Sequence, residues 1–311
     1  MIREKIASWW TTRLLRALDG ERLPTVLMQE LVRRGVTEQE QARFLERCRD
    51  QGLAQAAVPL LREALERAEA PRELGPRLLG RTPDAPTPDG EPFGYAIGLG
   101  TRCFTSAMLR RQQLRAFSSP FDWIFSSPGM ITHCLRDDFR TFLAPAYYEA
   151  VPPQARVDGP DVNLCDHVYY RDHYGVRFVF NHTDPNTAEG YAYFERCVGR
   201  LRRALDARSR PLLVCVMLAY HYEPARVAEL FAAVRERNAR AELLCVVVEE
   251  PQAGALLPAL VPLDEVPGVP LYRLHPVSAL GGVEFADPID ELPVARLVRR
   301  QRFDLQPAPP A

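Results

Sequence analysis

The spacing of apolar positions divides the chain into two parts. In residues 1–70 apolar side chains recur at helical spacing, for example at Leu14, Leu15 and Leu18, which predicts a small helical bundle. A two-helix repeat unit is an alternative for this part, although no second copy recurs at a fixed period. Residues 71–93 are rich in proline and lack apolar periodicity, so they are predicted to form a linker.

Beyond the linker, short apolar runs alternate with amphipathic segments. The runs cover residues 95–99, 176–180, 212–218, 243–248 and 269–274. The third and fourth runs are apolar on both faces, which is typical of parallel strands that are covered on both sides. Segments 196–206 and 225–237 have helical periodicity. Residues 94–297 are therefore predicted to be an α/β domain, a largely parallel sheet covered by helices in a Rossmann-like three-layer arrangement, and residues 298–311 a surface tail.

Composition and charge narrow the class of protein. The chain has 311 residues, 47% hydrophobic and 25% charged, which suffices for one sizeable core plus an appendage. Its 39 basic and 40 acidic residues balance to a net charge of −1, so no nucleic-acid footprint and no polybasic membrane patch is expected. The N-terminus has charges where a signal peptide would need its apolar run, so no signal peptide is expected. No stretch approaches about 18 consecutive apolar residues, so no membrane span is expected. We therefore expect a cytoplasmic protein.

The cysteines are single and widely spaced. Their odd number and the absence of any Cys-x-x-Cys pair favour reduced thiols over a disulfide framework or a structural zinc site. The seven residues are Cys48, Cys103, Cys134, Cys165, Cys197, Cys215 and Cys245.

One cysteine follows a motif that carries chemistry. The string Gly98-Leu-Gly-Thr-Arg-Cys103 follows the first apolar run and opens a helical pattern. Gly98 and Gly100 permit a tight turn, and a helix N-terminus beside Arg102 is expected to lower the pKa of the Cys103 thiol, which favours a nucleophile. The alternative is that Cys103 is a small buried packing residue. A dinucleotide site is not indicated, because Cys103 stands where the third glycine of that motif would be.

These residues also carry a resemblance to a known family. The string from Ile97 to Cys103, followed by Pro120-Phe-Asp-Trp123, resembles a bacterial family of unknown function described as papain-like cysteine peptidases, whose members carry a similar Ser-Leu-Gly-x-x-Cys element and then Pro-Phe-Asp-Trp. The resemblance covers residues 95–185 and extends toward residue 280. It implies that Cys103 is a nucleophile, and it requires no metal or organic cofactor.

A papain-like mechanism also needs a histidine as general base and a group that orients it. The resemblance points to His182, which we expect just beyond an apolar strand at the carboxyl edge of the sheet. Because Thr183 separates His182 from Asp184, the orienting group stays open among Asp184, Asp122 and Asn181. The alternative for His182 is an exposed loop histidine.

Further residues are candidates for the walls of the site. Asp122 and Trp123 form a wall or, alternatively, belong to an apolar plug in which Asp122 caps the next turn. His221 and His275 each follow a predicted strand and are candidates for the same crevice. Predicted substrate-binding residues are Gly98, Gly100, Arg102, Trp123 and His221.

A second polar cluster contains two further histidines. His167 and His173, with Cys165 and Asp166 beside them, could bind a metal, but their spacing matches no standard zinc pattern, and a polar loop beside the active site is the preferred interpretation.

The sequence is therefore consistent with three functions from different classes. The leading hypothesis is a thiol-dependent hydrolase or acyl-transfer enzyme that acts on an amide or ester of a peptide or small molecule, with backbone N–H groups at the glycine turn binding the oxyanion. The first alternative is a carbohydrate- or nucleotide-sugar-binding transferase-like protein. The second is a non-catalytic interaction protein whose N-terminal helices bind a protein partner.

Overall fold

The computed structural model describes residues 91–157, 159–206, 208–251, 258–287 and 290–310. Nearly all described residues belong to one compact unit, which is built from residues 90–253, 258–295 and 301–311. The predicted bundle at 1–70 and the linker up to residue 90 lie outside the described residues. None of the helices described here is long and apolar enough to cross a membrane.

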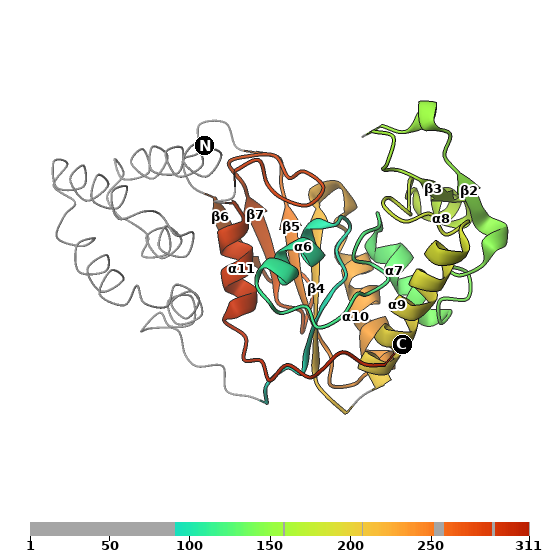
Figure 1. The fold of residues 1–311 in the computed structure, drawn as a ribbon. Coiled ribbons are helices and arrows are strands. Elements are labelled where there is room, and N and C mark those ends of the chain that lie inside the picture. Colours follow the sequence, from blue (N-terminus) through green and yellow to red (C-terminus); the bar gives the residue numbers. More distant parts are fainter. Residues whose placement is uncertain (1–90, 158, 207, 252–257, 288–289, 311) are drawn as a thin grey trace, which may run out of the picture. The chain divides into compact units, whose positions relative to one another are not determined.

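A five-stranded mixed sheet organises the described unit (Figure 1). The strand order is β1-β4-β5-β7-β6, with parallel pairing throughout except for β6, which is antiparallel to β7 at the edge. A two-stranded antiparallel sheet, β2-β3, lies apart from it. The strands are β1 (Tyr95–Gly98), β2 (Tyr148–Ala150), β3 (Cys165–His167), β4 (Pro211–Leu218), β5 (Glu242–Val248), β6 (Ala259–Leu263) and β7 (Leu271–His275).

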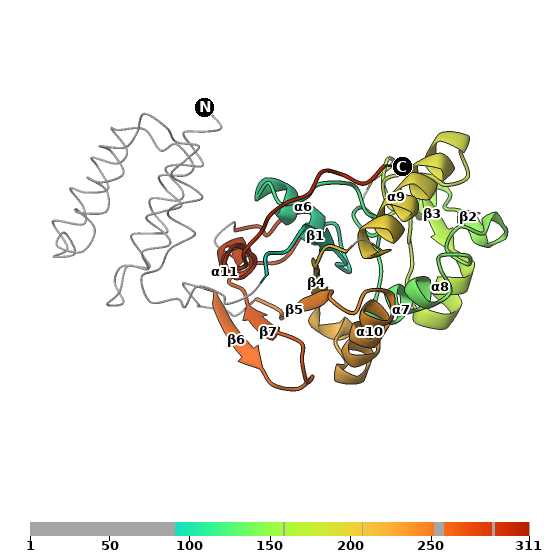
Figure 2. The same cartoon turned by 90° about the horizontal axis from the view of Figure 1, so that it is seen from below.

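Helices cover both faces of the large sheet. Figure 2 shows α6 on one side of it, and α7, α9 and α10 on the other. The helices are α6 (Phe104–Arg111), α7 (Pro128–Arg136), α8 (Val168–Tyr174), α9 (Ala188–Asp206), α10 (Pro224–Arg237) and α11 (Glu291–Arg299), with single 3-10 turns η1 (Pro145–Tyr147), η2 (Pro153–Ala155) and η3 (Ala219–His221). The prediction of an α/β domain with a mostly parallel sheet is confirmed.

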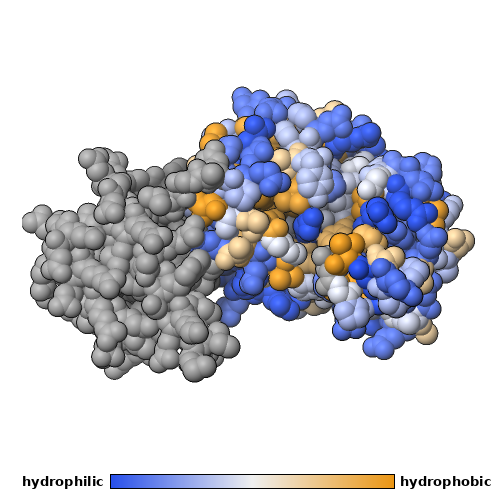
Figure 3. Space-filling model, turned by 90° about the horizontal axis from the view of Figure 1, so that it is seen from above, coloured by the Kyte–Doolittle hydropathy of each residue, from blue (hydrophilic) through white to orange (hydrophobic). Residues whose placement is uncertain are grey.

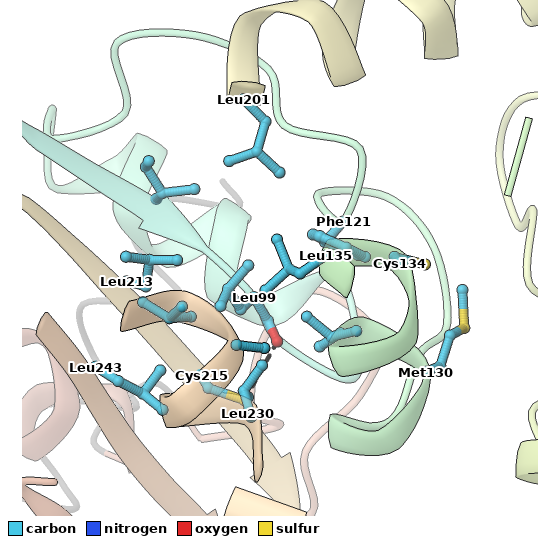
Figure 4. Close-up of a cluster of buried hydrophobic side chains, with 14 of the residues drawn as sticks. Leu99, Phe121, Met130, Cys134, Leu135, Leu201, Leu213, Cys215, Leu230 and Leu243 are labelled. Carbon is cyan, nitrogen blue, oxygen red and sulfur yellow. Dashed lines mark hydrogen bonds between the residues drawn. The ribbon is translucent and has the colours of Figure 1, made fainter. Parts of the chain in front are cut away.

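The main core lies between the sheet and helices α7, α9 and α10. Leu99, Leu213 and Leu243 project from the strand side toward Leu201 of α9 and Leu230 of α10 (Figure 4). All of these side chains are buried. The opposite faces of β4 and β5 are buried too, which explains why their sequences are apolar without alternation.

The prediction of a strand at residues 176–180 is wrong. This segment forms only an isolated bridge, in which Phe180 pairs with Cys165, and the backbone φ of Phe178 is +53°. A positive φ breaks the extended geometry that a continuous strand needs. Val179 and Phe180 are nevertheless fully buried, because they pack into the core as a loop rather than as a strand. The remaining strand of the large sheet, β6, was not predicted; its sequence Ala-Leu-Val-Pro-Leu is apolar, but it contains Pro262 and forms a mostly exposed edge strand.

The turn between β1 and α6 is unusually tight. The N–H groups of Leu99 and Thr101 continue the pairing with β4 by donating to Val214 and Val216. A side chain at Gly100 would place its Cβ 2.0 Å from the Thr105 hydroxyl oxygen, and one at Gly98 would lie 2.8 Å from the Ser106 hydroxyl oxygen. The glycines are therefore needed for the close approach of α6 to the turn, and neither has a positive φ.

The C-terminal segment runs beside the start of β1. Asp304 donates its N–H to the carbonyl of Phe93, and Gln306 donates to Gly94. The rings of Phe93 and Phe303 lie 5.9 Å apart.

Candidate active site

Cys103 lies where the first parallel strand passes into a helix. It is the N-cap residue of α6, and β1 leads directly into it at the carboxyl edge of the sheet. Its side chain is fully buried, with 0% of its surface exposed. Burial raises the pKa of the Cys103 thiol to about 11; a hydrogen bond from Asn181 and the charge of Arg102 act in the opposite direction. The expected lowering of this pKa is therefore wrong, because the cost of burying a thiolate exceeds the stabilisation by its neighbours.

The side-chain amide of Asn181 connects the thiol to a histidine. It hydrogen-bonds the Cys103 thiol, and its nitrogen Nδ2 lies 2.9 Å from Nε2 of His182. Its oxygen Oδ1 accepts from the backbone N–H of Asn163 at 2.8 Å and from the Asn163 amide at 2.9 Å. Because a backbone N–H can only donate, the Asn181 oxygen must face Asn163, so Nδ2 donates and His182 Nε2 accepts.

His182 is thus joined to Cys103 through Asn181 rather than directly. The residue is exposed, and partial burial of the imidazole lowers its pKa. Acceptance at Nε2 requires the neutral tautomer with the proton on Nδ1. The structure brings the predicted Cys103 and His182 into one neighbourhood, although the expected strand before His182 is absent.

Asp184 stabilises the start of α9. One of its carboxylate oxygens accepts from the backbone N–H of Asn186 at 2.9 Å and from the Asn186 side chain at 3.0 Å. Its carbonyl accepts from the N–H and hydroxyl of Thr187. These contacts give Asp184 a structural role at this turn, and its role in orienting His182 stays a prediction.

Asp122 ties the Pro-Phe-Asp-Trp loop to α6. Its Oδ1 accepts from the Ser106 hydroxyl at 2.5 Å, and its Oδ2 accepts from Arg115 at 2.8 Å and from the backbone N–H of Ser119 at 3.0 Å. Burial raises its pKa, while these hydrogen bonds and the Arg115 charge oppose the rise. Both oxygens are engaged, so this carboxylate holds the loop beneath the site.

Trp123 lies at the other end of α6 from Cys103. The guanidinium groups of Arg110 and Arg115 lie over its ring at 5.3 and 5.5 Å from the centroid. Arg110 follows Cys103 by about two turns of helix, or roughly 10 Å. The contacts of Trp123 are thus with these two arginines, and its predicted role in substrate binding stays a prediction.

Arg102 precedes Cys103 and contacts Tyr220, the residue before His221. An N–H of Arg102 donates to the Tyr220 hydroxyl at 3.4 Å, and its guanidinium lies 5.4 Å from the centroid of the Phe125 ring. Burial and the charge of Arg102 lower the pKa of His221 to about 4. His275 ends β7, and because β5 separates β7 from β4, it lies roughly 10 Å further along the edge.

This edge of the sheet forms one face of the described unit. The carboxyl ends of the parallel strands point toward the top of Figure 1. Figure 3 looks down on this end and shows apolar residues near the middle of the face, with hydrophilic residues around them.

The second polar segment forms a separate group, which we call the aromatic cluster: His133, Cys134, Tyr147, His167, Tyr169, Tyr170 and Tyr174. His167 is fully buried, stacks on Tyr147 and bonds the carbonyl of Thr141 through Nε2 at 3.0 Å. His173 is exposed and stacks on Tyr169. Among the described residues, no group of three His, Cys, Asp or Glu side chains is suited to hold a metal ion.

Three contributors to the site were not predicted from the sequence. Asn163 orients Asn181, while Phe125 and Tyr220 hold Arg102. Tyr220 directly follows an apolar run and precedes a candidate histidine, which is a usable signal. No signal in the sequence points to Asn163, because its effect depends on a contact with a residue 18 positions away.

Comparison with known protein families identifies a match for the region around the site. A family model matches residues 95–252, just over half of the chain, and its description is "Putative papain-like cysteine peptidase". No curated protein and no solved structure matches the chain.

Proposed function

The chain belongs to the family described as "Putative papain-like cysteine peptidase", and on that premise we propose that it is a thiol-dependent hydrolase or acyl-transfer enzyme. The observation that supports the proposal is the amide of Asn181, which hydrogen-bonds both the Cys103 thiol and the His182 imidazole. A cysteine, a histidine and an asparagine are the side chains that papain-like catalysis uses.

In the proposed reaction, the Cys103 sulfur attacks the carbonyl carbon of an amide or ester. The thiol proton passes to the imidazole of His182. Collapse of the tetrahedral intermediate breaks the bond from carbon to the leaving nitrogen or oxygen, and the imidazolium gives its proton to that atom. Water then cleaves the thioester, which releases a carboxylic acid and regenerates the thiol.

Asn181 has a role on each side of the proton transfer. An amide N–H that points at the sulfur stabilises the thiolate more than the thiol. The same NH2 group bonds both the sulfur and the basic nitrogen of His182, so it separates them by two hydrogen bonds. A short rotation of the imidazole, or one bridging water, would allow the proton to pass between them. The N–H groups in the first turn of α6 have no partner within the helix and supply the oxyanion site.

The burial of Cys103 sets a condition on this reaction. With 0% exposure and a pKa of about 11, the thiol is protonated at neutral pH and shielded from substrate. Substrate must therefore displace the side chains above it before attack.

Alkylation kinetics test the nucleophile. Iodoacetamide at pH 7.5, followed by peptide mass spectrometry, gives the rate at each cysteine. Burial raises the pKa of Cys134 further than that of Cys103, and Cys134 has a tyrosine hydroxyl as partner instead of an amide donor. We expect Cys103 to react at least about tenfold faster than Cys134, and to lose that advantage in His182→Ala.

Equal rates at Cys103 and Cys134 would remove the support for a thiol nucleophile. Hydrolysis is tested in parallel with pooled fluorogenic amide and ester substrates. Cleavage that disappears in Cys103→Ala and persists in Cys134→Ala supports the proposal, whereas cleavage that survives in Cys103→Ala contradicts it. In that case binding of nucleotide sugars becomes the next function to test.

A further inference from the structure

The guanidinium group of Arg102 lies next to the candidate nucleophile and is not neutralised by a carboxylate. Within the described part of the chain it forms no ion pair, whereas Arg115 pairs with Asp122 and Arg273 with Glu249. Its one hydrogen bond there is the donation to the Tyr220 hydroxyl. A guanidinium has five N–H donors, so several remain available to a ligand.

The surroundings hold this cation in place. The guanidinium lies over the face of Phe125 and donates to the hydroxyl of Tyr220, and both contacts favour one position; the Tyr220 ring lies 4.2 Å from the His221 ring. A planar donor group whose position is already fixed loses little entropy when it binds an anion in a bidentate manner. His221 is close enough for the charge of Arg102 to lower its pKa and, being neutral, leaves the local charge at +1.

We infer that the substrate carries a carboxylate close to the bond that Cys103 cleaves, and that Arg102 binds this carboxylate with His221 beside it. This inference rests on the proposed function, because it assigns a specificity group to the same site. The single positive charge matches a singly charged carboxylate rather than a doubly charged phosphate. Arg102 is thus a specificity-determining residue.

A pair of alkylating reagents tests the inference. Iodoacetate carries a carboxylate and iodoacetamide carries a neutral amide on the same reacting carbon. In both reactions the sulfur forms a bond to that carbon as iodide leaves, and the thiol proton goes to solvent. The ratio of the two rates at Cys103 therefore reports the preference for the anion and cancels changes in thiol pKa and access.

In the wild type we expect the rate with iodoacetate divided by the rate with iodoacetamide to be about tenfold higher at Cys103 than at Cys134. Arg102→Gln should remove the excess, and Arg102→Lys should restore part of it. Arg110→Gln is the matched control, because Arg110 lies on the same helix but over Trp123, and it should leave the ratio unchanged.

The outcomes separate this inference from the proposed function. If Cys103 reacts fast with both reagents and the ratio is the same in Arg102→Gln, the carboxylate site is wrong and the thiol nucleophile stands. If Cys103 reacts no faster than Cys134 with either reagent, the proposed function fails and the inference fails with it.

A binding measurement checks the site without thiol chemistry. Sodium acetate is titrated into the full-length protein while the His221 imidazole resonances are followed by NMR, with sodium chloride as the ionic-strength control. We expect a saturable shift in wild type that is lost in Arg102→Gln. An acetate response equal in the two proteins would overturn the assignment to Arg102.

Discussion

Two neighbourhoods of this domain each combine buried cysteine with histidine, and they differ in what surrounds the sulfur. Around Cys103 the partners are the Asn181 amide and the charge of Arg102, at the end of a parallel strand. In the aromatic cluster the Cys134 thiol lies 3.1 Å from the Tyr170 hydroxyl, and the Tyr170 ring lies 4.3 Å from the His167 ring. An amide donor and a cation favour a thiolate, whereas aromatic rings provide packing but no charge stabilisation.

The comparison shows that residue type alone does not identify a site. His167 lies in the aromatic cluster with burial lowering its pKa to about 4, and the pKa of His221 is lowered to about 4 beside Arg102. Both imidazoles are neutral at pH 7, yet only His221 lies at the sheet edge near Cys103. Position relative to the strand ends, rather than the pKa, separates the candidate site from the structural core.

Removing the carboxylate beneath the site should have the largest effect. Asp122→Ala leaves Arg115 and the Ser119 N–H without their buried partner, and we expect the free energy of unfolding to fall by about 4 kcal/mol. Asp184→Ala is the control, since it removes hydrogen bonds at a less buried turn and should cost about 1 kcal/mol. Urea denaturation measures both, and equal losses would contradict the anchoring role of Asp122.

The second largest effect should be the loss of stability at low pH through His167 of the aromatic cluster. The folded-state pKa of His167, about 4, lies below its usual value of 6.5, so the unfolded chain takes up a proton first as the pH falls. The stability that the neutral imidazole contributes is complete above pH 6.5 and is lost toward pH 4, by up to about 3 kcal/mol. In urea denaturation at pH 7, 5.5 and 4.5, His167→Phe should flatten this dependence, and so should His221→Phe, because burial lowers the pKa of both imidazoles to about 4. A slope unchanged by His167→Phe would assign the acid sensitivity to other groups.

A single hydroxyl in the aromatic cluster should matter less. Tyr170→Phe removes the group that bonds the Cys134 thiol and lies 3.4 Å from Nδ1 of His133, and we expect a loss of about 1–2 kcal/mol. Tyr174→Phe keeps the ring contacts and should cost less than about 0.5 kcal/mol. Cys103 alkylation should be unchanged in both variants; a slower rate in Tyr170→Phe would connect the two neighbourhoods.

The amide of Asn181 should have an effect on reactivity that is confined to one thiol. Asn181→Ala removes the donor that stabilises the Cys103 thiolate, so we expect iodoacetamide alkylation at pH 7.5 to slow about tenfold. Asn186→Ala is the matched control, because Asn186 donates to the Cys165 thiol at 3.3 Å. It should leave Cys103 unaffected. A rate in Asn181→Ala equal to wild type would show that the amide does not act on the thiol.

The sequence by itself determined the features that depend on local pattern. Continuous apolar runs at 212–218 and 243–248 predicted parallel strands, because a strand buried on both faces has no polar side. The glycine turn before Cys103 predicted a strand-to-helix junction, and the structure has β1 and α6 there. The residues that the family model matches, 95–252, likewise form one continuous segment of the sequence.

Only the tertiary structure decided how residues distant in sequence meet. The run at 176–180 is as apolar as a strand, yet it packs as a loop, because its burial comes from the core around Phe180 and not from strand pairing. Asn163 reaches Asn181 across 18 positions, and Arg102 reaches Tyr220 across 118. The pKa of Cys103 rises where a helix N-terminus alone would lower it, because desolvation depends on every atom packed around the sulfur and cannot be read from neighbours in sequence.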